Sequence, residues 1–478
     1  MVFSSPTFLF LFLPAVLLAT WAAPVRLRRF VLLAASVLFY AWGVQEFVLV
    51  ILASTLVDWA LARGMAVLRA RGRTRAARGL LLLGLAQNLG LLAWFKYAGF
   101  LSEQVARLVD VLGLGSPGTL QILLPIGISF FTFEKVSYLV DVWRGDVEAR
   151  RDPIDLLLFV SLFPRSIAGP IVRLREIQHD LREPRPRIDM VQGGAIRFAH
   201  GLAKKVLIAD QISPVADAAF AAAADGTLTT SSAWLGAVAY SLQLYFDFSA
   251  YSDMAIGIGM MLGFRLPENF NRPYSSLSIT DFWRRWHITL SRWFRDYVYI
   301  PLGGSRGGPA ATQRNLLIVF VLTGIWHGAG WAFLLWGLYH GAWLMIERRM
   351  GWRHGVGDAV RLPWLRRASV LLIVLIGWVL FRAESLHLAA HYYRVMLVPT
   401  GGTTATVDVA LGHQTLAALL VGACIVLLPG HRSGGRTLVE GTGRRVLVAR
   451  VALLAAVLPI ALAMAFSSDY SPFLYFQF

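Results

Sequence analysis

The stretch "LTGIWHGAGWAFLLWGLYHG", residues 322–341, is almost wholly apolar, yet it carries His327 near its middle and His340 near its end. An apolar run of about 20 residues is long enough to cross a lipid bilayer as a helix. Ionisable side chains are costly inside a membrane and usually face an interior cavity. The stretch therefore predicts a membrane helix, and it marks His327 as a candidate functional residue.

Apolar stretches of similar length recur along the 478 residues, of which 56% are hydrophobic and only 15% are charged. A soluble chain usually has about 25% charged residues. We therefore expect an all-α polytopic membrane protein with roughly ten to twelve membrane helices. The links between apolar stretches are short, which leaves no room for a separate water-soluble catalytic domain. Residues 1–478 are thus predicted to form a single integral-membrane domain.

Two apolar segments in the middle of the chain look interrupted. Residues 154–172 contain Pro164, Arg165, Gly169 and Pro170, and "GLAKKVLIAD", residues 201–210, places two lysines in a helical pattern. Irregular backbone at membrane depth is tolerated only where protein or water surrounds it. We therefore expect re-entrant or short cavity-lining helices here.

The net charge of +17 would suit nucleic-acid binding, but the distribution of the arginines argues against it. They gather at the ends of apolar runs, as the positive-inside bias produces. Residues 62–79 hold six arginines and no acidic residue, so we place this link in the cytoplasm together with residues 432–445. The same orientation puts both chain ends outside, with the first apolar segment read as an uncleaved span.

The second concentration of ionisable residues is "ITDFWRRWHITLSRWFRDYVYIPLGGSRGG", residues 279–308. One interpretation is an amphipathic helix at the membrane surface, where Trp and Arg are common. The other is an anion site, because backbone N–H groups of a Gly-rich turn beside arginines bind anions. The two are compatible: a helix at the cytoplasmic face would also receive an anionic substrate.

The remaining polar residues have both structural and functional interpretations. His327 is either a packed histidine or a reactive one, and Gly324, Gly328 and Gly330 would allow close approach of a helix or a substrate. For His340, the structural interpretation is favoured. His387 and His391 are four residues apart but have no visible third ligand, so no metal site is predicted. Asp247 and Asp253 would serve an ion path, or more simply bond to Tyr and Ser in the bundle. Cys424, the only cysteine, is expected to be buried and structural.

These segments together resemble the membrane-bound O-acyltransferase family, in its bacterial alginate O-acetyltransferase-type branch. The resemblance covers nearly the whole chain. It rests on "MVFSSPTFLFLFLP", "WFKYAGF", "LLPIGISFFTFEKVSYLVDVWRG", "GLAKKVLIAD", "YFDFSAYSDMAIGIGMMLGFRLPENFNRPY", "DFWRRWHITLSRWFRDYVYIPLGG", "TGIWHGAGW" and "SPFLYFQF".

The resemblance implies a helical bundle around a central tunnel, with His327 at the family's essential histidine and His287 at its second polar position. An imidazole kept neutral by burial can accept the proton of an attacking hydroxyl, and general-base help contributes roughly 10²–10⁴-fold. We expect His287 to orient the donor or stabilise an oxyanion. The other expected site residues are grouped by role: donor-binding Trp283, Arg284, Arg285, Trp286 and Arg292, and tunnel-lining Asp281, Trp326 and Gly328.

The resemblance further implies a cytoplasmic thioester donor, acetyl-CoA in this branch, with no bound cofactor and no metal. The acyl group would cross the cytoplasmic (inner) membrane, within its lipid, to an extracytoplasmic partner acyltransferase that modifies a polysaccharide; no nucleic acid is expected to bind. Peptidoglycan or another envelope acceptor stays open. A proton-relaying transporter or flippase, or a scaffold of a secretion complex, is a competing class.

Overall fold

A computed structural model describes residues 1–44, 47–115, 117–355, 358, 360–428, 432–467 and 473, which contain helices and irregular segments but no strand. The all-α class is therefore confirmed. The chain divides into two compact units. One contains Met1, Pro6–Gly194 and Ala255–Pro267, and the other contains Val2–Ser5, Ala195–Met254 and Glu268–Phe478. A single functional domain stays a prediction.

The first unit holds the early helices, and local sequence sets several of their ends. At α6, Asp152 accepts a hydrogen bond from the backbone N–H of Ile154, and Pro153 occupies the first turn, where its missing N–H costs nothing. The α3–α4 turn contains Gly72 with φ of +71°, a conformation that glycine adopts without strain. The elements are η1 (Phe8–Phe12), α1 (Leu13–Ala22), α2 (Val25–Val44), α3 (Phe47–Ala70), α4 (Thr74–Val111), α5 (Ile128–Arg144), α6 (Pro153–Ser161) and α7 (Leu174–Arg182).

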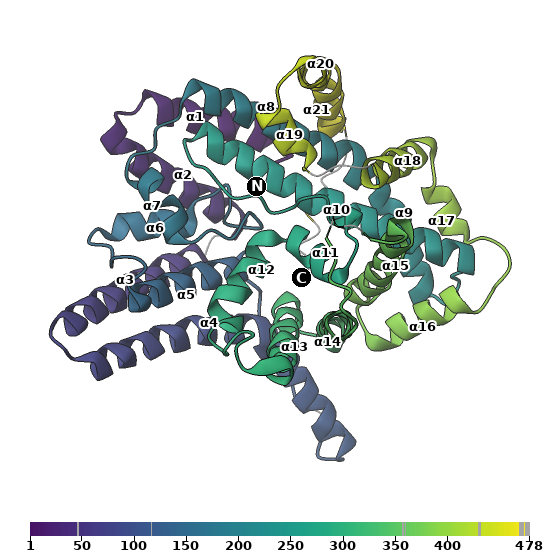
Figure 1. Cartoon of the computed structure of the whole chain (residues 1–478), viewed down its shortest axis with the longest axis horizontal. Helices are drawn as coiled ribbons and strands as arrows, with labels where there is room; N and C mark the ends of the chain where they lie inside the picture. Colours follow the sequence, from purple (N-terminus) through teal and green to yellow (C-terminus); the bar gives the residue numbers. More distant parts are fainter. Residues whose placement is uncertain are drawn as a thin grey trace. The chain divides into compact units, whose positions relative to one another are not determined.

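Two of the boundaries between the units fall within α8 (Ile188–Lys204) and α10 (Thr230–Met261). The second unit carries the remaining helices, which Figure 1 labels along the chain. They are η2 (Lys205–Ala209), α9 (Asp210–Ala224), η3 (Pro273–Ser275), α11 (Ile279–Arg285), α12 (Ile288–Phe294), η4 (Arg295–Tyr299), α13 (Gly308–His327), α14 (Trp331–Met350), α15 (Pro363–Arg382), α16 (Leu386–Leu397), α17 (Ala405–Ala410), α18 (His413–Leu427), α19 (Gly434–Glu440), α20 (Arg444–Ala452), η5 (Leu453–Val457) and α21 (Leu458–Ser467).

Five helical runs within the described residues are long and apolar enough to cross a membrane. They are Phe47–Ala70, Thr74–Val111, Ile188–Ala224, Pro363–Arg382 and Arg444–Ser467. Shorter apolar helices cover Phe8–Ala22 and His413–Leu427. These helices support a multi-pass membrane protein. The count of ten to twelve spans, and the orientation, stay predictions.

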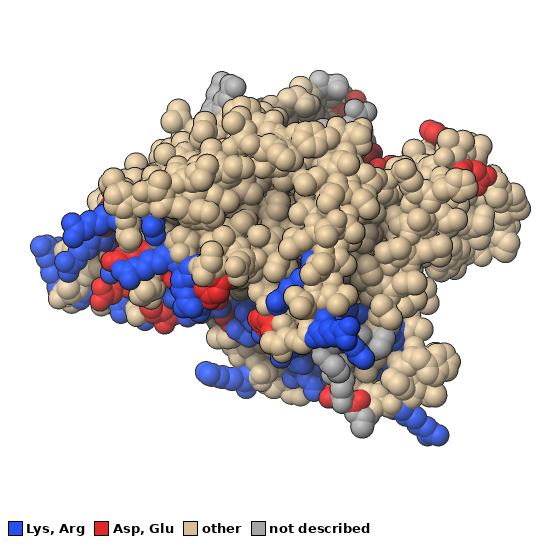
Figure 2. Space-filling view, turned by 90° about the horizontal axis from the view of Figure 1, so that it is seen from above, with Lys and Arg blue, Asp and Glu red and all other residues tan. Residues whose placement is uncertain are grey.

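The surface fits contact with lipid. Figure 2 shows broad areas of one face without charged residues, while Lys and Arg gather in clusters. Large apolar side chains such as Leu49, Leu123 and Val448 are more than half exposed. Cys424 is also exposed, on α18, so its prediction as a buried thiol was wrong. The reason is that an apolar helix in lipid needs no buried face toward protein.

Several predicted segments have different boundaries. The sequence is mostly apolar over residues 122–142, but α5 begins only at Ile128, after Gly127 with φ of +80°. The segment "GLAKKVLIAD" is not re-entrant: it lies in the continuous run Ile188–Ala224. It stays helical because its lysines find carboxylate partners. The break predicted within residues 154–172 is present, since α6 ends at Ser161.

Residues 322–341 do not form one helix. The helix α13 ends at His327, the backbone is extended at Gly328 and Gly330, and α14 begins at Trp331. The two helices pack tightly as a hairpin: a Cβ on Gly324 would lie 2.3 Å from the carbonyl oxygen of Phe333. The glycines beside His327 therefore serve the approach of a second helix, one of the two alternatives that the sequence left open.

Candidate active site

His327 occupies the last position of α13, beside the break in the hairpin. Its side chain is 7% exposed and lies among aromatic rings, with centroid distances of 4.8 Å to Trp326, 5.1 Å to Trp336 and 5.0 Å to Phe381. Gly328 must be small, because a Cβ there would lie 2.1 Å from the ring of Phe333. The break therefore places an imidazole at a helix end inside an apolar surrounding.

His287 lies between α11 and α12 and is 1% exposed. The start of α11 is fixed by Glu347 of α14, which accepts hydrogen bonds from the backbone N–H (2.8 Å) and hydroxyl (2.9 Å) of Thr280. A carboxylate at a helix N-terminus is stabilised by the helix dipole. The ring of His287 packs edge-on against Phe248 at 4.8 Å.

Both imidazoles line one cavity of about 300 Å³ between α11, α12, η4, α13 and α14. Its walls are mostly apolar and aromatic, with a few hydroxyl groups. Its lining consists of Thr280, Trp283, Arg284, Trp286, His287, Leu290, Ser291, Phe294, Arg295, Tyr299, Leu316, Val319, Phe320, Thr323, His327, Leu344, Arg348 and Arg353. An apolar pocket with a few convergent polar groups is the usual form of a small-molecule site.

Four arginines line the cavity at some distance from the hairpin break. Arg284, Arg295 and Arg353 are exposed and Arg348 is half-buried, whereas the two histidines are buried. Arg348 comes 17 residues after Trp331, the first residue of α14, which corresponds to about 25 Å along a helix. Within the described residues, no ion pair joins Arg284, Arg348 or Arg353 to a carboxylate. The cavity thus combines exposed or half-buried arginines with two buried imidazoles.

The structure brings together five of the predicted site residues: Trp283, Arg284, Trp286, His287 and His327. The other five lie outside the cavity lining. Arg285 pairs with Asp281 at 2.9 Å, and Arg292 is exposed on α12. Trp326 and Gly328 pack beside His327. Of residues 301–308, the Gly-rich turn that was predicted as an anion site, none lines the cavity. The roles assigned to these residues stay predictions.

Sequence reasoning missed Arg348 and Arg353 as cavity residues. The signal was present in "ERRMGWRHG", a basic segment that directly follows the apolar run. It was interpreted only as a topology signal, because nothing in the sequence indicates that α14 folds back beside α11.

The other intramembrane ionisable residues lie elsewhere. His340 is fully buried against the rings of Trp283 (5.0 Å) and Trp336 (5.1 Å), outside the cavity lining, an arrangement that suits its structural interpretation. Asp247 and Asp253 both pair with lysines: Lys205 lies 2.9 Å from Asp247, and Lys204 lies 2.6 Å from Asp253. Among the described residues, no group of three or more His, Cys, Asp or Glu is placed to hold a metal.

A cavity that combines arginines with buried imidazoles inside an all-helical membrane protein is suited to an anionic substrate and to proton-transfer chemistry. Comparison of the sequence with family models agrees with this class. The model of the membrane-bound O-acyltransferase family matches residues 79–381, which include both histidines and all four arginines of the cavity. The chain belongs to this family, and the predicted resemblance is confirmed. It is a membrane-bound O-acyltransferase.

Three relatives show the range of the family. The chain is 42% identical to the probable alginate O-acetylase AlgI of Azotobacter vinelandii, with the whole of both chains covered. It is 35% identical to the peptidoglycan O-acetyltransferase of Helicobacter pylori, over 83% of this chain and 80% of the relative. It is 30% identical to the teichoic acid D-alanyltransferase of Bacillus subtilis, over 45% and 56%.

Proposed function

We propose that this enzyme takes an acetyl group from acetyl-CoA in the cytoplasm and passes it across the inner membrane for O-acetylation of an extracytoplasmic polysaccharide. A partner acyltransferase outside the membrane completes the transfer. The observation that carries the proposal is the cavity whose lining combines exposed arginines with the buried His287 and His327.

The arrangement suits an elongated anionic thioester. Arginine forms strong charge-assisted hydrogen bonds with phosphate, and Arg284, Arg348 and Arg353 have no carboxylate partner within the described residues to compete for them. By the positive-inside bias, the end of α14 with Arg348, Arg349 and Arg353 faces the cytoplasm, where acyl-CoA is found. The acyl end of such a donor would lie in the apolar part of the cavity, toward the hairpin break.

His327 is assigned as the general base. An acceptor hydroxyl oxygen attacks the thioester carbonyl carbon, and its proton moves to the imidazole. The carbon–sulfur bond then breaks, and the leaving thiolate takes up a proton. An oxygen ester and a free thiol result, so atoms and charge balance. The aromatic surroundings of His327 exclude water, which would otherwise hydrolyse the thioester.

The acceptor class follows from the relatives. Those compared above act on alginate, peptidoglycan and teichoic acid, which are all polymers of the cell envelope. The alginate relative is the more similar over the whole chain, which favours a polysaccharide acceptor. Peptidoglycan is the alternative, supported by the 35% identity to the Helicobacter pylori enzyme.

The test uses purified full-length protein in lipid nanodiscs with radiolabelled acetyl-CoA. We expect slow release of free CoA that disappears in His327→Ala. Cells that express the protein should carry acetyl esters on a secreted polysaccharide, and the same variant should abolish them. Turnover that does not depend on His327 would overturn the assignment of the base. Acetyl esters on peptidoglycan alone would replace the proposed acceptor.

A further inference from the structure

Asn269 lies at the buried side of His287, outside the cavity lining, and is fully buried itself. Its side chain joins three groups. The amide nitrogen donates to the hydroxyl of Ser252 on α10 at 3.1 Å. The amide oxygen faces the hydroxyl of Thr289 at 2.9 Å, the backbone N–H of Thr289 at 3.3 Å and Nδ1 of His287 at 3.1 Å. Asn269 is thus the polar residue that contacts the ring of His287 from behind.

These contacts fix the orientation of the Asn269 amide. An asparagine oxygen and nitrogen are distinguished by their hydrogen-bond partners. The backbone N–H of Thr289 can only donate, so the Asn269 atom that faces it must be the oxygen. Because an amide oxygen only accepts, Nδ1 of His287 must carry a hydrogen and donate it.

The tautomer of His287 follows from this bond. A neutral imidazole has one N–H, so when Nδ1 carries it, Nε2 presents a lone pair. In the structure Nε2 is buried and has no hydrogen-bond partner, while the ring lines the cavity. A buried polar atom without a partner costs free energy, and a substrate hydrogen bond would recover that cost.

The backbone at His287 is held in place by the same residue. His287 has φ of +42° and ψ of +55°, the left-handed region that residues other than glycine rarely adopt. The next residue, Ile288, donates its N–H to the carbonyl oxygen of Asn269 at 2.9 Å. Asn269 therefore fixes both the strained turn and the ring that the turn presents.

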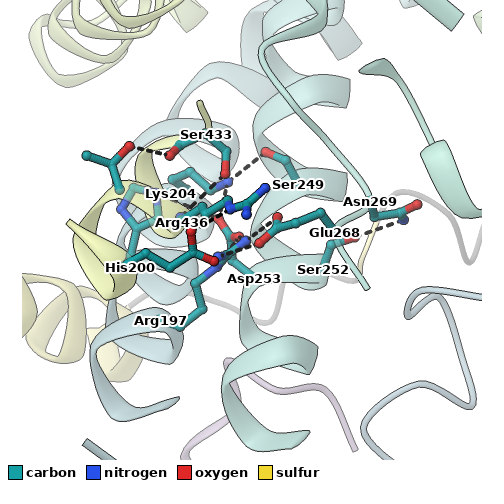
Figure 3. A network of polar contacts seen from close by, with 12 residues as sticks. Arg197, His200, Lys204, Ser249, Ser252, Asp253, Glu268, Asn269, Ser433 and Arg436 are labelled. Atoms are coloured by element: carbon teal, nitrogen blue, oxygen red, sulfur yellow. Dashed lines mark hydrogen bonds and ion pairs between the residues drawn. The ribbon is translucent and has the colours of Figure 1, made fainter. Parts of the chain in front are cut away.

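An ion-pair bridge fixes Asn269 in turn (Figure 3). Arg197 of α8 bonds to Asp253 at 2.6 Å and, with two nitrogens, to Glu268 at 2.7 and 2.8 Å. Asp253 follows Ser252 in the chain, and Glu268 precedes Asn269. Arg197 thus joins the same two segments that the Ser252–Asn269 hydrogen bond joins, one residue away on each.

We propose that Asn269 is a positioning residue that sets the tautomer of His287, so that His287 meets the substrate with the lone pair of Nε2 and acts as a hydrogen-bond acceptor. The kinetic consequences of this inference rest on the proposed acyl transfer, whereas the tautomer of His287 does not depend on it. Of the two roles expected for His287, orientation of a substrate fits and donation to an oxyanion does not, because Nε2 has no hydrogen to give.

The kinetic test compares three variants in nanodiscs, with CoA release from acetyl-CoA as the readout. Asn269→Leu keeps the volume but removes the acceptor, so kcat should fall about tenfold or more, since the wrong tautomer of a catalytic histidine is costly. Asn269→Asp keeps an oxygen acceptor for His287 and Thr289 and should recover most of that loss. Asn271→Leu is the matched control: it makes the same change two residues away, where the side-chain oxygen has no partner. It should behave like the wild type.

The direct test is the tautomer. In protein labelled with ¹⁵N-histidine, the His287 signal is identified by its loss in His287→Gln. We expect the Nδ1–H tautomer in the wild type and the Nε2–H tautomer, or a mixture, in Asn269→Leu. A wild-type His287 with its hydrogen on Nε2, or equal kcat values for Asn269→Leu and Asn271→Leu, would overturn the inference.

Failure of this inference can be distinguished from failure of the proposed function. If the wild type shows no turnover that depends on His327, the proposed function fails, and the tautomer measurement still decides the inference. His287→Asn identifies the group that Nε2 accepts from. A raised KM for acetyl-CoA with unchanged kcat indicates an amide N–H of the donor. A lowered kcat with unchanged KM indicates the attacking hydroxyl, and the role of general base would then move from His327 to His287, because a hydroxyl has only one hydrogen to donate. If neither parameter changes, the acceptor role of His287 is wrong.

Discussion

Two regions of the second unit place ionisable groups among apolar helices, and they do so in opposite ways. Around Asp253, every charge that the sequence presents is paired: Arg197 and Lys204 both lie 2.6 Å from its carboxylate (Figure 3). Around the cavity, Nε2 of His287 has no partner and three arginines have no carboxylate within the described residues. The helices also differ, because the helical run Ile188–Ala224 and α10 continue through the paired region, whereas α13 ends at His327.

In a membrane protein, structural and reactive ionisable groups differ in whether their polar atoms already have partners. A paired charge is satisfied where it lies, so it holds helices together and leaves the backbone regular. Nε2 of His287, by contrast, has no hydrogen-bond partner within the described residues, and it is satisfied only when something enters the cavity.

The largest effect is expected from breaking the paired region. Arg197→Met keeps the length of the side chain but leaves Asp253 and Glu268 without their shared partner. Removing one member of a buried pair typically costs about 3–5 kcal/mol, because the remaining charge stays buried. The melting temperature in detergent should therefore drop by several degrees, and expression should fall.

Arg436→Met is the control for this change, because Arg436 pairs with Glu440 at 2.8 Å on the surface, with 44% of its side chain exposed. Such pairs contribute about 0–1 kcal/mol. Equal melting temperatures for the two variants would contradict the view that Arg197 holds this region together.

The next largest effect is expected at His327. If it is the general base, His327→Ala should fold normally and lose about 10²-fold or more of acetyl transfer. His327→Gln keeps bulk and hydrogen-bonding capacity but cannot accept a proton at neutral pH, so it should be nearly as inactive. Acetyl transfer and melting temperature are measured for both variants. An active, stable Gln variant together with an unstable Ala variant would instead make His327 a structural residue like His340.

How far the sequence predicts this molecule depends on whether the signal is local. Apolar runs predict the all-α class, and an arginine cluster marks the α3–α4 turn. The positions of His287 and His327 within sequence motifs make them candidates for the site. The cavity does not follow, since it depends on α14 folding back beside α11 through Glu347, a contact between residues 67 positions apart. The same holds for Lys204: a lysine pair in an apolar helix looks like an interruption until Asp253 is placed opposite.

A smaller effect, on the KM for acetyl-CoA, is expected for the arginines that line the cavity. Arg284→Gln and Arg348→Gln each remove one phosphate contact while preserving most of the side-chain volume. A charge-assisted hydrogen bond contributes about 1.5–3 kcal/mol, so the KM for acetyl-CoA should rise roughly tenfold or more, with kcat and melting temperature nearly unchanged. The control uses thioesters of dephospho-CoA, which lack one phosphate. If an arginine contacts that phosphate, its replacement should leave the KM for the dephospho-CoA donor unchanged. An unchanged KM in both variants would place donor recognition outside the cavity.

The smallest effect is expected for Arg285 and Arg292, which the sequence alone groups with Arg284. Arg285 pairs with Asp281 at 2.9 Å and also donates to the backbone carbonyl oxygen of Asn271 at 3.3 Å, so its guanidinium is already engaged. Arg292 is exposed and lies outside the cavity lining. Replacing either with Gln should change the KM for acetyl-CoA by less than about threefold, the range of a surface charge acting at a distance. The KM values of Arg285→Gln and Arg348→Gln are measured together at two salt concentrations. If the KM for acetyl-CoA rises as much in Arg285→Gln as in Arg348→Gln, the Arg285–Asp281 pair must open to bind the donor. The distinction between paired and unpaired arginines would then fail for α11.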